Sequence, residues 1–501
     1  MKLVPGIGFT LLAFLPIACF SARAASTAAQ SLHRAAGLRE AGDFKEAADV
    51  LSQALQEPAL SDAERAQLEF QREVLKRIKE DYSLSADELF AKLAASLKDA
   101  NRPEFDRWLA AGRFDGRKID GQMCYVDVSV RNLFFRYPEL RSRRLDDKDD
   151  TAEQKGRLEI CRQIKEAARK EGSPYVLPHH FTCTMTVSAS ATAAPAGATI
   201  RAWLPIPRMD PFQSDFKLLA SSSPVLALAP DTSPIRSACM EQPASTDHPA
   251  KFEITYSYTR SGVFFDLNPK AACAPDLSDP ELAKYVAEAP HVVFTAKIRK
   301  LARQIARSQT NPVLQARAFY DWIAANVKYS FAREYSTLTN ISDYCLSHRY
   351  GDCGQEALLF ITLCRSKGIP ARWQSGWNTF PGAKDIHDWT EIYLAPYGWV
   401  PVDPWAGVFA TRYCTALTDA ERHELRDFYF GGLDFFRMSA NSDHSMTLDP
   451  PKKTMRSDNV DFQRGELEWE GGNIYFDNFS NNLEVQELNL EKAVKATDEH
   501  R

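Results

Sequence analysis

Residues 350–377, YGDCGQEALLFITLCRSKGIPARWQSGW, place a cysteine at the start of a predicted buried helix. Apolar and small side chains recur at positions i, i+3, i+4 and i+7, which is the pattern of one buried helix face. The residues of that face are Ala357, Phe360, Ile361 and Cys364. Gly368 is the predicted cap of the helix, and Pro370 follows it. The stretch therefore predicts that Cys353 lies at or next to the helix N-terminus.

The predicted position of Cys353 favours chemical reactivity. A helix N-terminus carries partial positive charge and free backbone N–H groups, which favour a thiolate and can stabilise an oxyanion. The glycine-rich turn formed by Gly351 and Gly354 is expected to let a substrate carbonyl approach the sulfur. From this stretch alone, a nucleophile, a disulfide partner and an ordinary core cysteine all remain open.

Two downstream motifs supply a histidine and a carboxylate. Residues 386–394, IHDWTEIYL, alternate as a strand does, and residues 398–407, GWVPVDPWAG, follow a turn as a second strand. A hairpin between them puts Asp403 roughly opposite His387, although the register could differ by one or two residues. In that arrangement His387 takes the thiol proton and later protonates the leaving amine, while Asp403 orients the imidazole.

Several neighbours belong to the predicted site. Asp385 and Asp388 flank the histidine as alternative orienting carboxylates, but alternation puts Asp388 on the opposite face of the strand. The backbone N–H of Cys353 and the side chains of Tyr329 and Tyr335 are candidate oxyanion donors. Aromatic core is the alternative interpretation for each tryptophan near the site. The residues expected to bind substrate are Tyr335, Trp373, Trp377 and Trp389.

The three motifs together resemble the transglutaminase-like superfamily of papain-like Cys-His-Asp acyl-transfer enzymes, in its bacterial exported type. The resemblance rests on Cys353, His387 and Asp403, which are separated by 34 and 16 residues, and covers roughly residues 310–410. It implies a cysteine-bearing helix packed on an antiparallel sheet that supplies the histidine and the aspartate. It also implies a thioester acyl-enzyme that forms from an amide and is resolved by water or an amine.

The N-terminus predicts export. An apolar run ending at Phe20 is followed by Ala22-Arg23-Ala24, so residues 1–24 are expected to be a signal peptide. The mature protein is then secreted or periplasmic. Cys19 is a lipidation candidate, although its context, LPIAC, is poor for acylation. No later stretch reaches the ~18 uninterrupted apolar residues of a membrane span.

Removal of the signal peptide leaves nine of the ten cysteines, an odd number. At least one thiol would then be unpaired in an oxidising compartment. Chain order makes Cys239–Cys273 and Cys124–Cys161 plausible disulfides, although order alone cannot fix the connectivity.

The rest of the sequence predicts a multidomain α+β protein. Changes in composition and periodicity mark its segments. In order they are a helical N-terminal domain with one tetratricopeptide-like hairpin (25–145), a charged connector (146–174), a β-sandwich (175–285), the papain-like transglutaminase core (286–415) and a C-terminal extension packing on that core (416–501). The helical domain is a possible docking site for a partner.

Composition narrows the functional classes. The net charge is −5 and no basic tract is present, which argues against nucleic-acid binding. No metal site or other cofactor is predicted, because the acidic residues between 458 and 477 do not follow an EF-hand pattern. The sequence predicts an enzyme acting on peptide or protein amides, with hydrolysis favoured over amine transfer. The alternative is a non-catalytic scaffold that uses its helical and sandwich domains for binding.

Overall fold

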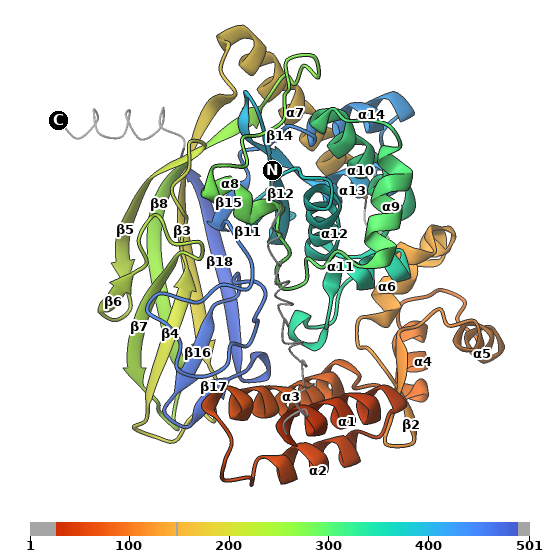
Figure 1. The fold of residues 1–501 in the computed structure, drawn as a ribbon, viewed down its shortest axis with the longest axis vertical. Helices are drawn as coiled ribbons and strands as arrows, with labels where there is room; N and C mark the ends of the chain where they lie inside the picture. Colours follow the sequence, from red (N-terminus) through yellow and green to blue (C-terminus); the bar gives the residue numbers. More distant parts are fainter. Residues whose placement is uncertain (1–26, 147–148, 489–501) are drawn as a thin grey trace, which may run out of the picture. The chain divides into compact units, whose positions relative to one another are not determined.

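The protein is represented by a computed structural model that describes residues 27–146 and 149–488 (Figure 1). The chain divides into two compact units: residues up to 75 together with 118–121, and the remainder. The predicted signal peptide, including Cys19, lies outside the described residues.

The first unit is a helical hairpin followed by a third helix. It contains α1 (Thr27–Ala41), α2 (Phe44–Ala54) and most of α3 (Asp62–Asp81). Gly42 joins α1 and α2 with a φ of 91°, a conformation that glycine adopts without steric cost. The amphipathic α2 buries Phe44 and Leu51, so the predicted helix pair is present.

The second unit contains the remaining helices, and most of them are amphipathic. Their bounds are α4 (Ala86–Ala94), α5 (Arg102–Ala110), α6 (Ser129–Arg136), α7 (Thr151–Glu171), α8 (Pro280–Ala283), α9 (Ala296–Ala306), α10 (Pro312–Asn326), α11 (Ile341–His348), α12 (Cys353–Arg365), α13 (Pro404–Arg412) and α14 (Asp419–Phe428), with short 3₁₀ helices η1 (Pro138–Arg143), η2 (Lys284–Val286), η3 (Tyr335–Thr337) and η4 (Phe476–Asn478). Helix α12 contacts α9, α10, α11 and α13, so the cysteine-bearing helix lies inside a helical layer.

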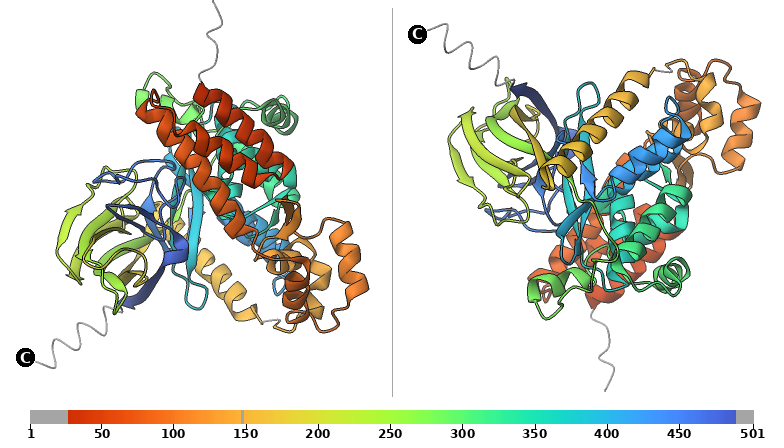
Figure 2. Two further views of the ribbon diagram at one scale, coloured as in Figure 1. Left: turned by 90° about the horizontal axis from the view of Figure 1, so that it is seen from below. Right: turned by 90° about the horizontal axis from the view of Figure 1, so that it is seen from above.

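Two five-stranded antiparallel sheets form one side of this unit (Figure 2). The first pairs β14 (Gly432–Leu433), β8 (Ala250–Phe264), β3 (Tyr175–Ala189) and β18 (Phe479–Leu488), with β5 (Gln213–Ser221) also on β8; the second has the order β17 (Gly472–Ile474), β16 (Glu466–Trp469), β4 (Thr199–Pro205), β7 (Ser237–Pro243) and β6 (Val225–Leu228). Burial alternates along β3 and β8 with period two, which indicates one packed face and one partly solvated face.

A four-stranded antiparallel sheet carries the candidate site. Its order is β13 (Gly398–Val402), β12 (Asp385–Leu394), β11 (Ala371–Asn378) and β15 (Arg437–Asn441). Gly376 of β11 makes the approach to β15 possible, because a Cβ at this position would lie 1.9 Å from the Met438 carbonyl oxygen. Helix α12 packs on β11 and β12, as the cysteine-bearing helix was expected to do. Short strands are β1 (Gly116–Ile119), β2 (Gln122–Tyr125), β9 (Lys328–Tyr329) and β10 (Tyr350–Gly351).

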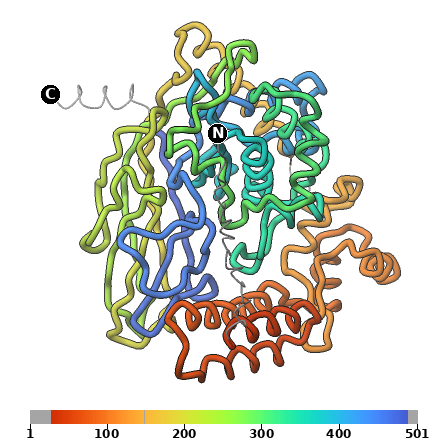
Figure 3. The backbone as a smooth tube through the Cα atoms, viewed as in Figure 1, coloured from red at the N-terminus to blue at the C-terminus, as the bar shows by residue number. Residues whose placement is uncertain are grey.

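The C-terminal segment contributes a strand to every one of these three sheets. β15 joins the site sheet, β16 and β17 extend the second five-stranded sheet, and β18 pairs with β3 over ten residues. Figure 3 shows this segment, in blue, running alongside strands from much earlier in the chain. It is therefore an integral part of the second unit.

All nine cysteines among the described residues are free. The suggested disulfides Cys239–Cys273 and Cys124–Cys161 are absent, which corrects that expectation. Cys161 and Cys239 are buried, whereas Cys273 is exposed and Cys124 is only partly buried, so the cysteines within each suggested pair differ in their exposure to solvent. None of the described helices is long and apolar enough to span a membrane.

Candidate active site

Cys353 is the first residue of α12. Asp352 caps this helix, because its carboxylate accepts a hydrogen bond from the Gln355 backbone N–H at 3.0 Å. The Tyr335 hydroxyl donates to the same carboxylate oxygen at 2.6 Å. The rest of α12 is buried through Arg365, whereas Cys353 remains partly accessible. The prediction of a cysteine at the helix N-terminus is confirmed.

Gly354 has a different role from the one expected. A Cβ there would lie 2.2 Å from Tyr335 Oη, 2.6 Å from Asp388 Oδ2 and 2.8 Å from Trp373 Cη2. These distances are too short for any side chain, and the atoms belong to the protein. Gly354 therefore lets α12 pack against its own sheet, rather than leaving room for a substrate carbonyl.

His387 and Asp403 are joined across the hairpin of β12 and β13. The register pairs Thr390 with Val402, so Asp403 follows the last paired residue of β13. His387 Nε2 lies 2.8 Å from Asp403 Oδ2, while Asp403 Oδ1 accepts a hydrogen bond from the Ala406 backbone N–H. Asp403 thus orients the imidazole and caps α13 at the same time, and the predicted proximity of histidine and aspartate is observed.

Arg437 of β15 adds a positive charge behind this pair. Its Nη1 lies 3.2 Å from Asp403 Oδ2, and its Nε donates to Asp434 Oδ2 at 3.1 Å. The Tyr429 hydroxyl also donates to Asp434, at 2.8 Å. Arg437 and Asp403 are both fully buried. A buried guanidinium between two carboxylates keeps both carboxylates ionised.

The pKa shifts of His387 and Asp403 favour a neutral imidazole that is hydrogen-bonded to an ionised carboxylate. Burial would raise the pKa of Asp403, but His387 and Arg437 outweigh burial and hold that pKa below its usual range. Burial lowers the pKa of His387, and the repulsion from Arg437 adds to this effect, although Asp403 opposes it. His387 is therefore neutral at pH 7.

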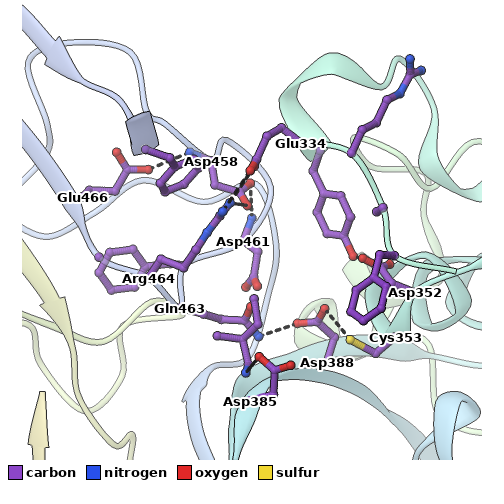
Figure 4. Close-up of a pocket in the computed structure, with 18 of the residues that line it drawn as sticks. Glu334, Asp352, Cys353, Asp385, Asp388, Asp458, Asp461, Gln463, Arg464 and Glu466 are labelled. Atoms are coloured by element: carbon purple, nitrogen blue, oxygen red, sulfur yellow. Dashed lines mark hydrogen bonds and ion pairs between the residues drawn. The ribbon is translucent and has the colours of Figure 1, made fainter. Parts of the chain in front are cut away.

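The thiol of Cys353 contacts Asp388 (Figure 4). Its Sγ lies 3.4 Å from Asp388 Oδ2. Asp388 Oδ1 accepts a hydrogen bond from Gln463 Nε2 at 2.8 Å, and the same amide donates to the His387 backbone oxygen at 2.9 Å. Within residues 27–146 and 149–488, no hydrogen bond joins Cys353 to His387. The strand alternation that separates His387 from Asp388 thus places them on two sides of the cysteine.

The surroundings of Cys353 favour a protonated thiol. Burial raises its pKa well above the ordinary value, and the charges of Asp388 and Asp352 raise it further. Burial also raises the pKa of Asp388, with Asp461 as the second cause. The expectation of a resting thiolate considered only the helix N-terminus. That expectation left out the burial of the sulfur, which is the largest cause of the raised pKa, and the two neighbouring carboxyls.

Two cavities meet at Cys353. One, of about 300 Å³, is bordered by Cys353 and Asp388 and is called the Asp388-side cavity. The other, of about 440 Å³, is bordered by Cys353 and His387 and is called the His387-side cavity. The residues that border both are Arg131, Tyr329, Cys353, Asp385 and Ile386. The cysteine is therefore open to ligand on two sides.

Three of the four residues expected to bind substrate are core residues instead. Trp373, Trp377 and Trp389 are at most 6% exposed and border neither cavity. Trp389 stacks beneath the imidazole of His387, at a centroid distance of 6.0 Å. Tyr335 does border the Asp388-side cavity. The three tryptophans were named for their closeness to the motifs, and sequence alone could not tell a buried aromatic from a cavity wall.

Sequence reasoning missed three residues that contact the site. Trp405 borders the His387-side cavity and packs edge-on against His387 at 4.9 Å between ring centroids. Its position in the sequence, directly after Asp403-Pro404, could have indicated that it lies near the site. Arg437 and Gln463 lie far downstream and carry no local motif. Among the described residues, no group of three or more His, Cys, Asp or Glu side chains is arranged to hold a metal ion.

Comparison with known sequences gives a family match for the segment that contains Cys353, His387 and Asp403. Residues 299–404 match the family model of the transglutaminase-like superfamily. YebA, an uncharacterized protein of Bacillus subtilis strain 168, is 25% identical over 130 residues, which are 22% of this chain and 18% of YebA. The chain thus aligns with less than a fifth of the length of that relative.

Solved structures give partial similarities. A candidate cysteine protease from Cytophaga hutchinsonii superposes with a TM-score of 0.43 at 16% identity, covering 63% of this chain and 91% of that one. The periplasmic domain of TgpA from Pseudomonas aeruginosa gives 0.26 at 15% identity, covering 46% and 96%. With Cys353, His387 and Asp403 all inside the matched segment, residues 299–404 form a transglutaminase-like core.

Proposed function

We propose that this protein is an exported transglutaminase-like cysteine enzyme that attacks peptide or glutamine amide bonds through Cys353. One observation carries the proposal: Cys353 and His387 border the same cavity, and Asp403 holds His387 through Nε2. In the part of the chain that the structure describes, no hydrogen bond occupies His387 Nδ1. This nitrogen is therefore available for the thiol proton.

The proposed reaction begins with proton transfer from the Cys353 thiol to His387 Nδ1 as sulfur attacks the amide carbon. The carbonyl electron pair moves to oxygen, which gives a tetrahedral oxyanion. Collapse of this intermediate breaks the C–N bond, and the leaving nitrogen takes the proton from His387. Ammonia or an amine departs, and the acyl group stays on Cys353 as a thioester. Water then attacks the thioester carbon and gives one proton to His387. The new intermediate collapses with cleavage of the C–S bond, His387 returns the proton to the sulfur, and the acid departs.

The thiol must first turn from Asp388 toward His387. A rotation about χ1 of Cys353 supplies this movement, because the sulfur lies where the two cavities meet. Since the pKa of Cys353 is raised and that of His387 is lowered, the resting pair is neutral. Proton transfer then accompanies the attack, and no thiolate–imidazolium pair exists before substrate binds.

Two donors are proposed for the oxyanion. The backbone N–H of Cys353 lies at the start of α12, where the first backbone amides lack partners within the helix. Tyr329 borders both cavities beside Cys353. Tyr335 is a weaker candidate, because its hydroxyl is already bound to Asp352. We therefore assign Tyr329 the role of the second donor.

Hydrolysis is proposed over amine transfer, because water is the default acceptor and no amine-binding site is recognised. Export is supported by the signal-peptide pattern of residues 1–24. Cell fractionation, with N-terminal sequencing of the mature chain, tests export. Protein that retains residues 1–24 in the cytoplasmic fraction would contradict it.

The proposed chemistry is tested by trapping and by turnover. The purified protein is incubated with pools of glutamine-containing peptides, with and without a primary amine. Intact-mass spectrometry detects an acyl adduct on Cys353, and ammonia release or amine incorporation separates hydrolysis from transfer. We expect adducts in the wild type and none in Cys353→Ala. Cys364→Ala is the matched control, since Cys364 is a fully buried cysteine of the same helix.

The role of His387 has its own test. Iodoacetamide labelling of Cys353 at pH 7, followed peptide by peptide, should slow by about 10²–10⁴-fold in His387→Ala. His423→Ala, at an exposed histidine of α14, should leave the rate unchanged. Equal labelling of the wild type and His387→Ala would remove the proposed proton acceptor. An absence of both turnover and adducts would favour a scaffold role.

A further inference from the structure

The charges around Cys353 are not balanced. Arg131 borders both cavities, and its guanidinium lies over the Phe331 ring at 3.8 Å. Lys384 borders the His387-side cavity, and its ammonium group contacts Asn482 Oδ1 and the Leu483 backbone oxygen. Within the described residues, neither cation forms an ion pair with a carboxylate. Two cations without counter-ions therefore lie at the cavity that contains the nucleophile and its base.

The other cations of the His387-side cavity are paired. Arg141 lies 3.1 Å from Asp150, and Arg157 lies 2.9 Å from Glu153. Arg144 is similarly paired with Asp146 at 3.0 Å. The positive charges of these three arginines are therefore largely compensated by carboxylates of the protein. Arg131 and Lys384 are thus distinguished by their missing counter-ions and not by their charge alone.

The carboxyls of the Asp388-side cavity are also engaged by protein donors. Gln463 donates to Asp388, and Ser375 donates to Asp461 at 2.5 Å. Glu334 is held by Arg464 at 2.6 Å. Of these three carboxyls only Glu334 is paired with a cation, so the Asp388-side cavity remains the more acidic side of Cys353. Asp385 is exposed and borders both cavities, and among the described residues its carboxylate accepts a hydrogen bond from the Ile386 backbone N–H alone.

The walls of the His387-side cavity are largely aromatic. The rings that line it are Phe134, Phe135, Tyr329, Trp405, Phe409 and Tyr413. These rings offer apolar contact to a ligand, whereas Arg131 and Lys384 are both exposed and attract an anionic group across solvent. A ligand that fits this cavity therefore combines an apolar body with a carboxylate. The negative charge of Asp385 partly repels the carboxylate of such a ligand.

We propose that the His387-side cavity binds a carboxylate of the substrate through Arg131 and Lys384, so that acidic peptides are the preferred substrates. The carboxylate belongs to a residue within one or two positions of the amide that Cys353 attacks. The inference rests on the proposed function only in taking the ligand to be a peptide substrate. The positive charge at the cavity is a separate property that can be measured without any amide chemistry.

The test uses two thiol reagents of similar size and opposite charge. Sulfonatoethyl methanethiosulfonate is anionic, and trimethylammonioethyl methanethiosulfonate is cationic. Their rates at Cys353 are followed by peptide-resolved mass spectrometry and divided by their rates at the exposed Cys273 of the same molecule. The normalised anion-to-cation ratio reports the local charge at Cys353, and it should shrink as salt is added.

Four variants give the expected pattern. Arg131→Gln and Lys384→Gln should each lower the ratio about three- to tenfold, and the double variant should lower it further. Asp385→Asn should raise it by a similar factor. The pair variant Arg141→Gln/Asp150→Asn is the matched control, because it removes a cation and its paired anion from the same cavity and leaves the net charge unchanged. We expect that control to change the ratio less than twofold. An unchanged ratio in the Arg131→Gln/Lys384→Gln variant, or an equal fall in the control, would overturn the proposal.

A second arm uses peptides and separates the two proposals. Binding of paired peptides, one with glutamate and one with glutamine beside the target amide, is measured by fluorescence anisotropy on Cys353→Ala. We expect the acidic peptide to bind about tenfold more tightly, and the difference to vanish when Arg131→Gln and Lys384→Gln are added. Equal binding overturns the carboxylate preference. Preferential binding without any turnover by the wild type refutes the proposed function and leaves the preference standing.

Discussion

Two buried aspartates of the candidate site, Asp403 and Asp388, lie in opposite electrostatic surroundings. Asp403 contacts His387 and Arg437, and these partners hold its pKa below the usual range in spite of complete burial. Asp388 contacts the thiol and Gln463, and burial with Asp461 nearby raises its pKa. Burial alone therefore does not decide the charge of a carboxyl. A buried cation supplies the difference.

The contrast assigns different tasks to the two sides of the site. On the Asp403 side, a fixed anion keeps the imidazole oriented. On the Asp388 side, a carboxyl that tends to hold its proton contacts the resting thiol. Substitutions at either aspartate, or at the residues that contact it, should separate these two roles.

Asp403→Asn should remove most of the reactivity that depends on a correctly oriented His387. The amide can present a donor to His387 Nε2, which fixes the wrong tautomer, and Arg437 loses one of its two anions. We expect labelling of Cys353 and any turnover to fall at least about 100-fold. Asp419→Asn, at an exposed pair with Arg422, should leave both unchanged. A fall of less than tenfold would contradict the assigned role.

Arg437→Gln should remove the buried positive charge that stabilises the ionised form of Asp403. Asp403 and Asp434 would then be buried without their shared cation, so the free energy of unfolding should fall by about 3–5 kcal/mol in urea titrations. Arg437 lowers the pKa of His387, so its removal should raise that pKa. Because the neutral imidazole is the base, the acidic limb of the pH–rate profile should move to higher pH.

The control for that charge is Arg162→Gln, which breaks a surface pair with Glu424. Its free energy of unfolding should change by no more than about 1 kcal/mol, and its pH profile should not move. A loss of stability in Arg437→Gln with an unshifted profile would mean that Arg437 supports the fold without tuning the base.

Asp388→Asn should increase the reactivity of the Cys353 thiol, whereas the substitutions at Asp403 and Arg437 affect His387. The Asp388 carboxyl raises the pKa of Cys353, so replacing it with an amide should lower that pKa. Iodoacetamide labelling measured from pH 7 to 9.5 should reach half of its maximum at lower pH, and the rate at pH 8 should rise about three- to tenfold. The amide oxygen of asparagine can still accept from Gln463. Slower labelling across the whole range would show that Asp388 activates the thiol.

Tyr335→Phe should have the smallest effect. It removes one hydrogen bond to Asp352 and keeps the Asp352 cap on Gln355. Thermal unfolding should show a loss of about 0.5–1.5 kcal/mol, with Cys353 labelling reduced less than threefold. Tyr393→Phe, in strand β12 of the site sheet, is the control. A collapse of labelling would indicate that Tyr335, and not Tyr329, stabilises the oxyanion.

The sequence predicted those parts of the site that local pattern determines. Cys353 followed from helix periodicity and a glycine–proline stop, and the pairing of His387 with Asp403 followed from one hairpin. The match to the transglutaminase-like family covers the same residues. In these segments a short range of chain defines both the backbone and the direction of the side chains.

Other parts of the site depend on contacts that no local pattern encodes. Arg437 and Gln463 reach the site only because the C-terminal segment returns to the sheet. Trp373 and Trp389 alternate correctly along their strands, but which face is covered depends on distant elements. The raised pKa of Cys353 has a similar origin, because the burial of the sulfur and the approach of Asp388 both depend on tertiary packing.

The return of the C-terminal segment also sets an order of events during synthesis. Cys353, His387 and Asp403 leave the ribosome before Arg437 and Gln463 do. β3 likewise appears about 300 residues before β18, its partner along one edge. A nascent chain that ends before residue 463 carries the nucleophile without the amide that links Asp388 to the His387 backbone. The link between Asp388 and the His387 backbone therefore forms only after residue 463 has been synthesised.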